Sequence, residues 1–288
     1  MPRTGLRRLS SRAELASWRA EQDPARPIRL VPTMGALHVG HDALFDLACA
    51  DGGLGIASVF VNPLQFERAD DLAAYPRTLE EDCARLEARG IEAVYHPEVE
   101  DMYGPDFQTT LAPGAGGEGF EGVARPGHFA GMLTVVHKLF LRVRPDEAVF
   151  GEKDAQQLFL VRRMVADLDL PVRIVPCPTV RESDGLALSS RNVHLGAEGR
   201  QRALGLSRAL DVVAASFAAG EREVARLETT LRAVMEEHGV AVAYASIVDE
   251  DRFLAPDPDL PGPRSWRAVV AGRVDEVHLL DNRFLGEA

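Results

Sequence analysis

Short apolar runs alternate with helical patterns up to about residue 175, and this alternation constrains the fold more than any other feature. The clearest run, Gly55–Val61, reads G-I-A-S-V-F-V and is rich in β-branched residues, as expected of a strand buried on both faces. Further strands are predicted at Ile28–Val31, Ala93–Tyr95, Glu147–Phe150 and Val172–Val175. Helices are predicted at 11–19, from the turn after Val31 to Ala50, and at 78–89, 127–143 and 154–167. Such alternation predicts an α/β fold, a Rossmann-like doubly wound parallel sheet.

The pattern changes after Ser190, which predicts a second, smaller α+β domain. Helical segments at 198–219 and 221–238 precede strands near 242–248, 268–271 and 276–280. The chain of 288 residues is long enough for two domains of ordinary size. We place the boundary near Val180, so that residues 1–179 form the Rossmann-like domain and residues 180–288 form the C-terminal domain.

The formal net charge of −12 argues against nonspecific nucleic-acid binding by a basic face, so an anionic small substrate would need a local basic pocket. The three cysteines are widely spaced and lack a C-x-x-C pair, which excludes a disulfide framework and disfavours a cysteine-rich zinc site. No apolar run approaches the length of a membrane span, and no apolar region follows the basic N-terminus. We expect a cytoplasmic protein with no nucleic-acid or membrane partner and no metal-ligating residues.

The segment Val31–His41, V-P-T-M-G-A-L-H-V-G-H, is the most informative one for function. A strand ends there, and His38 and His41 follow at a spacing that places both on one face of a starting helix. The first N–H groups of a helix have no partner inside the helix, and the peptide dipoles favour negative charge at that end. We therefore expect this pair to bind a phosphate chain. The structural alternative is that the histidines only cap or pack the turn.

Three segments are expected to meet at one edge of the sheet because each follows a strand: Thr33–His41, Asn62–Phe66 and Gly151–Asp154. In open parallel sheets, ligands bind beyond the carboxyl ends of the strands, where the strand order reverses. This edge is therefore the expected site. A glycine-dense stretch at 112–131 is either a flexible lid or an ordinary surface loop.

Several polar residues in these segments suit an anionic substrate. Lys153 lies where a helix begins and could meet a phosphate as a point charge, while Ser189–Arg191 offers two hydroxyls and a guanidinium fork. Asp154 either caps the following helix or accepts hydrogen bonds from ribose hydroxyls. The neutral amides of Gln65 and Gln157 could orient a hydroxy acid without adding charge. Taken singly, each residue also fits a solvated, capping or surface role.

The combination is more specific than its parts. The motifs P-T-M-G-A-L-H-V-G-H, F-V-N-P-L-Q-F, Y-P-R-T, R-P-G-H-F-A-G, F-G-E-K-D-A-Q-Q and D-G-L-A-L-S-S-R-N occur in this order. The series resembles the pantoate–β-alanine ligase family along nearly the whole chain, most strongly from Val31 to Asn192. The His-x-Gly-His element also resembles the HIGH-type signature of nucleotidylyltransferases and class I aminoacyl-tRNA synthetases. L-S-S-R stands in the place of that superfamily's second, mobile phosphate-binding motif.

The resemblance implies an AMP-forming ligase that condenses (R)-pantoate with β-alanine, using ATP, through a tightly held pantoyl-adenylate. It implies catalytic roles for His41, as proton donor, and for His38, Lys153 and Arg191. The ATP-binding positions that it implies are Met34, Gly35, Ala36, Leu37, His38, Val39, Gly40, His41, Gly151, Glu152, Lys153, Asp154, Val180, Leu188, Ser189, Ser190 and Arg191.

The resemblance also implies ligands for the other substrates. Gln65 and Gln157 would bind pantoate, with Gln65 close to β-alanine as well. Further pocket candidates are Asn62, Tyr75, Arg125 and His128. Mg²⁺ would bind mainly through the ATP phosphates and water. The family resemblance further implies a homodimer.

Three residues depart from the family pattern, and none of them removes a proposed ligand. Val39 stands where glutamate is usual, Leu64 where methionine is usual and Ala155 where tyrosine is usual. Three other functions stay open. A nucleotidylyltransferase with another acceptor would keep the histidine pair but not the two glutamines. A synthetase that charges tRNA is disfavoured by the acidic chain, and a nucleotide sensor without chemistry would need fewer phosphate-facing groups.

Overall fold

The computed structural model of this chain describes residues 5–257 and 265–286. The chain divides into two compact units, the first comprising Met1–Gly151 with Leu160–Cys177 and the second Glu152–Phe159 with Pro178–Ala288. Helix α8 (Ala155–Asp167) therefore contributes residues to both units. The domain boundary expected after residue 179 stays a prediction.

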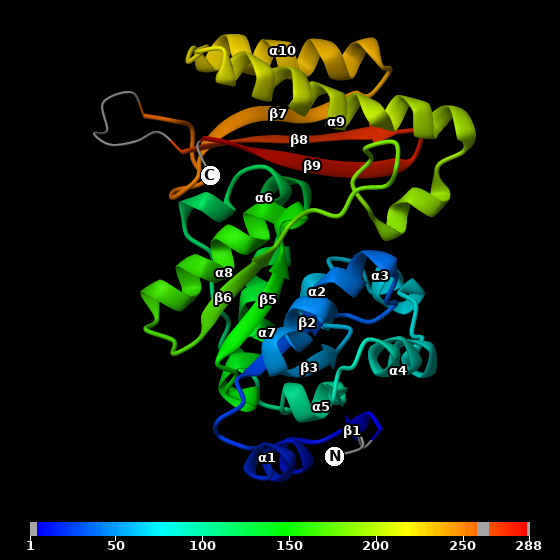
Figure 1. The fold of residues 1–288 in the computed structure, drawn as a ribbon, viewed down its shortest axis with the longest axis vertical. Helices are drawn as coiled ribbons and strands as arrows, with labels where there is room; N and C mark the ends of the chain where they lie inside the picture. Colours follow the sequence, from blue (N-terminus) through cyan, green and yellow to red (C-terminus); the bar gives the residue numbers. More distant parts are fainter. Residues whose placement is uncertain (1–4, 258–264, 287–288) are drawn as a thin grey trace. The chain divides into compact units, whose positions relative to one another are not determined.

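The first unit is built on a six-stranded parallel sheet with the order β1-β4-β3-β2-β5-β6 (Figure 1). Its strands are β1 (Arg7–Leu9), β2 (Ile28–Thr33), β3 (Leu54–Val59), β4 (Ala93–Tyr95), β5 (Glu147–Gly151) and β6 (Arg173–Cys177). The chain runs outward from β2 to β3 and β4, then returns to place β5 and β6 on the other side of β2. This reversal confirms the predicted doubly wound α/β sheet. The edge strand β1 was not predicted, because three residues with two arginines carry no strand periodicity.

The helices predicted at 11–19, 78–89 and 127–143 begin and end within one residue of those bounds, whereas the short helices Ala69–Ala74, Val99–Met102 and Glu121–Ala124 were not predicted. Ser11 caps α1 (Arg12–Ala20), since its side chain accepts a hydrogen bond from the Glu14 N–H. Strand β3 is almost wholly buried, and Val31, Phe45 and Leu86 of the surrounding core have no exposed surface. The helices are α1 (Arg12–Ala20), α2 (Val39–Cys49), α3 (Ala69–Ala74), α4 (Leu79–Ala88), α5 (Val99–Met102), α6 (Glu121–Ala124) and α7 (His128–Val143). Short 3-10 turns are η1 (Ala50–Gly52), η2 (Pro63–Gln65) and η3 (Ala115–Gly117).

The glycine-dense stretch at 112–131 folds into η3, α6 and the start of α7. Two of its glycines are required by close backbone approaches. A Cβ on Gly122 would lie 1.9 Å from the carbonyl oxygen of Gly117, and one on Gly131 would lie 2.1 Å from that of Leu64. Tight packing therefore explains glycine at these two positions, independently of any motion of the segment.

The second unit pairs a three-stranded antiparallel sheet with two long helices, which confirms the predicted smaller α+β fold. Its strands, in the order β7-β8-β9, are β7 (Ala241–Asp249), β8 (Trp266–Val274) and β9 (Val277–Leu285). Figure 1 shows α9 (Ala197–Ala218) and α10 (Val224–Glu237) on one face of this sheet. Leu210, Leu231 and Val270 are fully buried in the core between them. Two short 3-10 turns, η4 (Glu152–Asp154) and η5 (Ser190–His194), also belong to this unit.

Two general features of the described residues bear on function. None of the helices in residues 5–257 and 265–286 is long and apolar enough to cross a membrane. Within the same residues, no group of three or more His, Cys, Asp or Glu side chains is placed to hold a metal ion.

Candidate active site

The loop between β2 and α2 turns sharply through two left-handed residues. Gly35 has a φ of 81° and Ala36 a φ of 50°. A Cβ on Gly35 would lie 2.9 Å from a carboxylate oxygen of Asp82 and 3.0 Å from a methyl group of Val59. Position 35 therefore requires glycine both for its conformation and for its space.

Asp82 of α4 anchors this loop through its side chain. Its carboxylate accepts hydrogen bonds from the backbone N–H of Ala36 at 3.1 Å and from that of Leu37 at 2.8 Å. The hydroxyl of Thr78 donates to the same carboxylate at 3.3 Å, and Asp82 is only 2% exposed. A buried carboxylate with three donors is a strong anchor. Asp82 thereby fixes the segment that leads into the two histidines.

His38 and His41 form a reciprocal capping box at the start of α2. The Nδ1 atom of His38 accepts from the N–H of Gly40 at 3.1 Å, and the Nδ1 atom of His41 accepts from the N–H of His38 at 3.2 Å. The two ring centroids are 4.2 Å apart. This geometry corrects one expectation, because five backbone N–H groups of this segment donate to side chains of the protein: those of Gly35, Ala36, Leu37, His38 and Gly40. The ring nitrogens, more than these amides, are the groups that could meet a phosphate.

The capping bonds also indicate which tautomer each neutral ring adopts. A ring nitrogen that accepts an N–H bond carries no proton, so the neutral tautomer has its hydrogen on Nε2 in each histidine. Burial, together with the neighbouring His38, lowers the pKa of His41 to about 4. His41 is therefore a neutral hydrogen-bond donor at pH 7. Capping and phosphate recognition are compatible roles, since they use opposite ring nitrogens.

Asn62, three residues after β3, is a fully buried amide whose hydrogen-bonding positions are all used inside the protein. Its Nδ2 donates to Gln65 Oε1 at 2.9 Å and to the Gly131 carbonyl at 3.0 Å. Its Oδ1 accepts from the Tyr103 hydroxyl at 2.8 Å and from the Leu64 N–H at 3.3 Å. Because Gln65 Oε1 is taken by Asn62, the NH₂ group of Gln65 is the end that can donate to another molecule. Asn62 therefore orients Gln65.

His128 lies against Gln65, and Arg125 lies against His128. The Nδ1 atom of His128 lies 3.2 Å from the carbonyl oxygen of Gln65, and its Nε2 lies 3.4 Å from the Arg125 guanidinium. His128 is 7% exposed at the first turn of α7. Tyr75 occupies another position, where its ring packs edge-on against Phe66 with centroids 5.5 Å apart. The structure thus brings Asn62, Gln65, Arg125 and His128 together, and Tyr75 packs on Phe66, the residue that follows Gln65.

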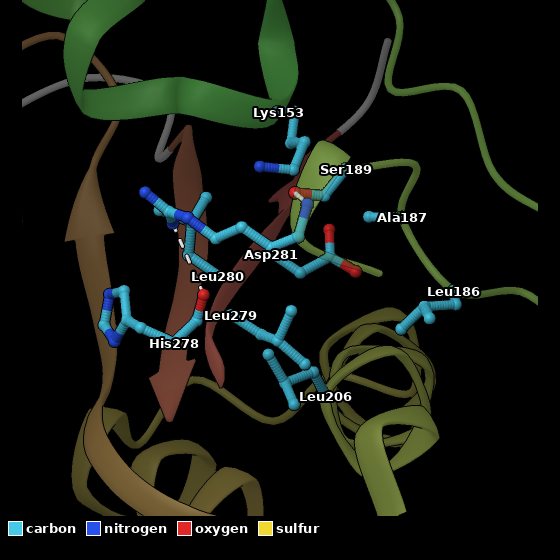
Figure 2. Close-up of a pocket in the computed structure, with 10 residues that line it drawn as sticks. Lys153, Leu186, Ala187, Ser189, Leu206, His278, Leu279, Leu280 and Asp281 are labelled. Atoms are coloured by element: carbon cyan, nitrogen blue, oxygen red, sulfur yellow. Dashed lines mark hydrogen bonds between the residues drawn. The ribbon is translucent and has the colours of Figure 1, made fainter. Parts of the chain in front are cut away.

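In the second unit, Lys153, Ser189 and Arg191 line one pocket (Figure 2). The pocket is also lined by His278 and Asp281 of β9 and by several leucines. Arg191 donates to the backbone carbonyl of His278 at 3.3 Å. Two cationic groups and a hydroxyl are chemically suited to bind phosphate oxygens, whereas the pocket itself, about 10 Å³, has room only for a water-sized group.

Residues 180–188 form a hairpin that leads into this pocket. The N–H of Leu188 donates to the Val180 carbonyl at 2.9 Å, and Arg181 pairs with Ala187 across a β-bridge. The Arg181 guanidinium forms two contacts with the Asp281 carboxylate, at 2.6 and 3.0 Å. The charge of Asp281 is therefore balanced by Arg181, whereas the Lys153 ammonium lies 3.7 Å from the carboxylate of Asp154.

The remaining predicted residues are placed as follows. Ser189 accepts from the Arg191 N–H at 3.3 Å as the cap of η5, whereas Ser190 is exposed. Gly151 ends β5, and Glu152 and Asp154 lie in η4. In the loop after β2, Met34 and Gly40 are partly buried, and Val39 is 55% exposed. Gln157 lies on α8 in the part that belongs to the second unit, whereas Gln65 belongs to the first unit. Ala155, one of the departures, is buried.

Sequence reasoning missed several residues that shape these sites. They are Asp82 and Tyr103 in the first unit and His278, Asp281 and Asn282 in the second. One available signal was the D-N pair in the centre of the strand pattern V-H-L-L-D-N-R-F-L, since buried polar residues require partners.

Comparisons with known proteins show which family the chain is similar to. A family model described as pantoate-beta-alanine ligase matches residues 7–284. A pantothenate synthetase of Thioalkalivibrio sulfidiphilus is 47% identical over 286 residues, with 96% of this chain and 97% of that protein covered. One from Mycolicibacterium smegmatis is 50% identical over 266 residues, with 92% and 82% covered.

Solved structures give the same result. The crystal structure of pantothenate synthetase from Thermus thermophilus matches with a TM-score of 0.87 at 44% identity, covering 98% of this chain and 100% of that one. A pantoate-beta-alanine ligase from Francisella tularensis, complexed with beta-gamma ATP and beta-alanine, matches with a TM-score of 0.75 at 29% identity. That match covers 98% of this chain and 99% of the other.

Proposed function

The chain belongs to the pantoate-beta-alanine ligase family, and from that premise we propose that it condenses (R)-pantoate with β-alanine by an ATP-dependent route. The products are pantothenate, AMP and diphosphate, and the intermediate is pantoyl-adenylate. The product, pantothenate, is the precursor from which coenzyme A is made.

The two steps define what the protein must supply. A carboxylate oxygen of pantoate attacks the α-phosphorus of ATP, and the bond from that phosphorus to the diphosphate oxygen breaks. The amine of β-alanine then attacks the acyl carbon, and AMP leaves with the attacking oxygen of the first step. Because a carboxylate and a phosphate are both anions, catalysis requires positive charge and a fixed orientation.

The observation that carries the proposal is the pocket of Lys153, Ser189 and Arg191. These three side chains are proposed to stabilise the charge that moves onto diphosphate in the first step. The pairing of Asp281 with Arg181 supports this role, because the Asp281 carboxylate then does not neutralise Lys153 or Arg191.

His38 and His41 are proposed to donate hydrogen bonds from Nε2 to the ATP phosphates, with His41 the more important donor. The low pKa of His41, about 4, supports a neutral donor rather than a cation. With His41 as a neutral donor, the positive charge that balances the ATP phosphates comes from Lys153, Arg191 and Mg²⁺. Mg²⁺ would travel with the phosphates, with phosphate oxygens and water as its ligands. We assign no protein residue to the metal.

Pantoate is assigned to Gln65 and Gln157, and β-alanine to the neighbourhood of Gln65. The bond from Asn62 to Gln65 supports this, because it directs the Gln65 NH₂ group to act as a donor. The relative from Francisella tularensis, complexed with ATP and β-alanine, supports both as ligands here. Arg125, His128 and Tyr75 remain candidates for the acid and amine substrates.

The nucleoside of ATP is assigned to backbone and polar positions that the family pattern supports. Gly151 and Asp154 are proposed at the ribose, and the Val180 backbone at adenine. Met34–Val39, Gly40, Glu152, Leu188 and Ser190 complete the proposed ATP-binding set. We also propose that the protein is a cytoplasmic homodimer that acts on small molecules and binds neither nucleic acid nor membrane.

Pyrophosphate exchange into ATP tests the proposal and separates the rival functions. Purified protein is incubated with ATP, Mg²⁺ and labelled pyrophosphate, with and without pantoate. Exchange that requires pantoate, followed by AMP release when β-alanine is added, is the expected result. Exchange that requires another acid would indicate a different acceptor. ATP binding without exchange under any acid would contradict the ligase proposal.

A further inference from the structure

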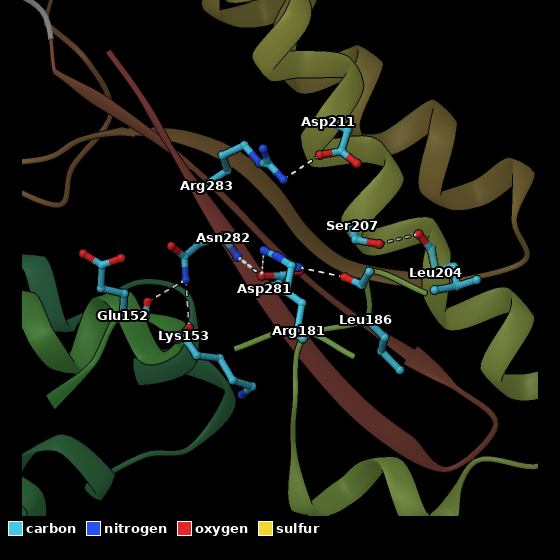
Figure 3. Close-up of polar contacts among 12 residues, drawn as sticks. Glu152, Lys153, Arg181, Leu186, Leu204, Ser207, Asp211, Asp281, Asn282 and Arg283 are labelled. Atoms are coloured by element: carbon cyan, nitrogen blue, oxygen red, sulfur yellow. Dashed lines mark hydrogen bonds and ion pairs between the residues drawn. The ribbon is translucent and has the colours of Figure 1, made fainter. Parts of the chain in front are cut away.

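The side chain of Asn282, on β9, binds the backbone at Glu152 and Lys153. Its Nδ2 donates to the carbonyl oxygens of Glu152 at 2.9 Å and of Lys153 at 2.8 Å (Figure 3). Asn282 is 5% exposed. One buried amide therefore uses both of its N–H bonds on two consecutive peptide groups, which leaves the η4 turn little freedom to rotate or shift.

A second buried residue fixes the direction of this amide. Arg267 of β8 donates to Asn282 Oδ1 at 2.5 Å, so the oxygen faces the guanidinium and the NH₂ group faces the η4 carbonyls. Arg267 is held by a two-point contact with Glu250 at 2.6 and 2.8 Å, and it is 6% exposed. Asn282 lies opposite Val269 in the β8–β9 ladder, which makes Arg267 its diagonal neighbour.

The same strand also holds the second cation of the pocket. His278, four residues before Asn282 on β9, accepts the Arg191 hydrogen bond through its backbone carbonyl. Strand β9 therefore contacts both cationic residues. The Asn282 side-chain amide binds the Lys153 backbone, and the His278 main-chain oxygen accepts from the Arg191 guanidinium. A rigid strand with a buried charge pair behind it can keep two side chains in a fixed relation.

We propose that Asn282 is a positioning residue, which holds the Glu152–Lys153 peptides so that the Lys153 ammonium enters the pocket of Ser189 and Arg191. The inference rests on the proposed function, because it assigns the pocket to diphosphate. Asn282 acts through Lys153 and does not itself contact substrate. Its effect is therefore confined to the step in which diphosphate forms.

The test uses Asn282→Asp, which has nearly the same shape but replaces the NH₂ donor by an oxygen. Two carbonyl oxygens would then face an acceptor, while the contact with Arg267 is kept. Arg283→Ala is the matched control, because Arg283 is the next residue on β9 and pairs with Asp211 outside the network. Asn282→Ser is a second variant for the case in which the Asn282→Asp protein does not fold, because the smaller serine side chain fits the same space.

The two half-reactions are measured separately in each variant. We expect Asn282→Asp to lower pantoate-dependent pyrophosphate exchange by about 10- to 100-fold, as a misplaced group does. Turnover of supplied pantoyl-adenylate with β-alanine should stay within about 3-fold of wild type, whereas a purely structural defect would lower both. In a Lys153→Ala background, Asn282→Asp should cause no further loss of exchange.

Equal losses in both half-reactions, or losses that multiply with Lys153→Ala, would overturn the inference. Wild-type protein without exchange would instead refute the proposed function. In that case, the affinity for inorganic pyrophosphate, measured by titration calorimetry, still tests the positioning role of Asn282. Weaker binding in Asn282→Asp than in Arg283→Ala supports the positioning role, and equal binding in the two variants refutes it.

Discussion

The backbone N–H of His38 donates to the Nδ1 atom of His41 at 3.2 Å, and this single contact decides which nitrogen of His41 carries the proton. With Nδ1 as an acceptor, the hydrogen of the neutral ring is on Nε2. The histidine that caps its own helix is thereby prepared to donate on the opposite side.

Replacing His41 tests that donor directly. We expect His41→Ala to lower pantoate-dependent exchange by about two to three orders of magnitude, the scale of losing one donor that stabilises transition-state charge. His137→Gln is the control, because His137 is a partly buried histidine of α7 outside the proposed site. Near-normal exchange in His41→Ala would leave the histidine with a capping role alone.

The pKa of His41 predicts an acid-sensitive component of stability. The folded protein protonates this ring near pH 4, whereas the unfolded chain does so near the ordinary value of 6.5. Between these values the unfolded state binds more protons, so stability is fully present above pH 6.5 and is lost as the pH falls toward 4. From pH 7 to pH 4.5, this one group should lower the free energy of unfolding by about 2 kcal/mol.

Denaturant unfolding of wild type and His41→Gln at both pH values isolates that component, since the other titrating groups are common to the two proteins. The acid-induced loss should be smaller in His41→Gln. If both proteins lose the same stability, the ring is not held neutral by burial.

Asp82→Asn tests the support of the histidine loop. The carboxylate accepts from two backbone N–H groups, whereas an amide would present an NH₂ group to one of them. One buried N–H left without an acceptor should destabilise the protein by about 1–3 kcal/mol. Exchange should fall as well, because the loop carries His38 and His41. Asp70→Asn, at an exposed position of α3, should be neutral in unfolding and exchange assays.

Gln65→Glu tests the pantoate assignment at constant size. The oxygen that accepts from Asn62 can remain, while the NH₂ group becomes a second carboxylate oxygen that repels an acid substrate. We expect the KM for pantoate to rise by about 10- to 100-fold, the value of one hydrogen bond to a charged group. The Kd of ATP should stay close to that of wild type. The same change at the exposed Gln201 serves as control, and an unchanged pantoate KM would remove Gln65 from the pantoate site.

Gly131→Ala tests the packing of the glycine-dense segment. The added methyl group would lie 2.1 Å from the Leu64 carbonyl oxygen, so α7 or the Asn62–Gln65 turn must shift. Overpacking of this kind should destabilise the protein by about 1–3 kcal/mol and lower its Tm by several degrees. Gly114→Ala is the matched control, since a Cβ there meets nothing within 4 Å. Equal Tm values for the two variants would contradict the close approach.

The parallel sheet was predictable from the sequence because its inner strands are buried on both faces and therefore read as continuous apolar runs. Strands β3 and β5 illustrate this, as their central residues are almost all buried. Strand β1 carries no such signal, since Arg7 and Arg8 are exposed at the edge and only Leu9 is buried. Its position depends on pairing with the distant β4.

The site residues that directly follow strands could be predicted from the sequence. Residues that contact the site from distant positions in the sequence could not. The histidine pair and the S-S-R segment stand in local patterns that the sequence shows directly. Asp82 and Asn282 act across 45 or more positions of sequence, on Leu37 and on Lys153 respectively, so only the folded chain reveals them. The use of the loop amides as capping donors was likewise invisible, because it depends on ring geometry.

Activation of pantoate as an acyl-adenylate is tested most directly by isotope transfer. Pantoate labelled with ¹⁸O in its carboxylate is incubated with the protein, ATP, Mg²⁺ and β-alanine, and the nucleotide product is analysed by mass spectrometry. Formation of pantoyl-adenylate predicts AMP that carries one ¹⁸O atom, because the carboxylate oxygen bonded to phosphorus leaves with it. Unlabelled AMP together with labelled phosphate or diphosphate would contradict that intermediate.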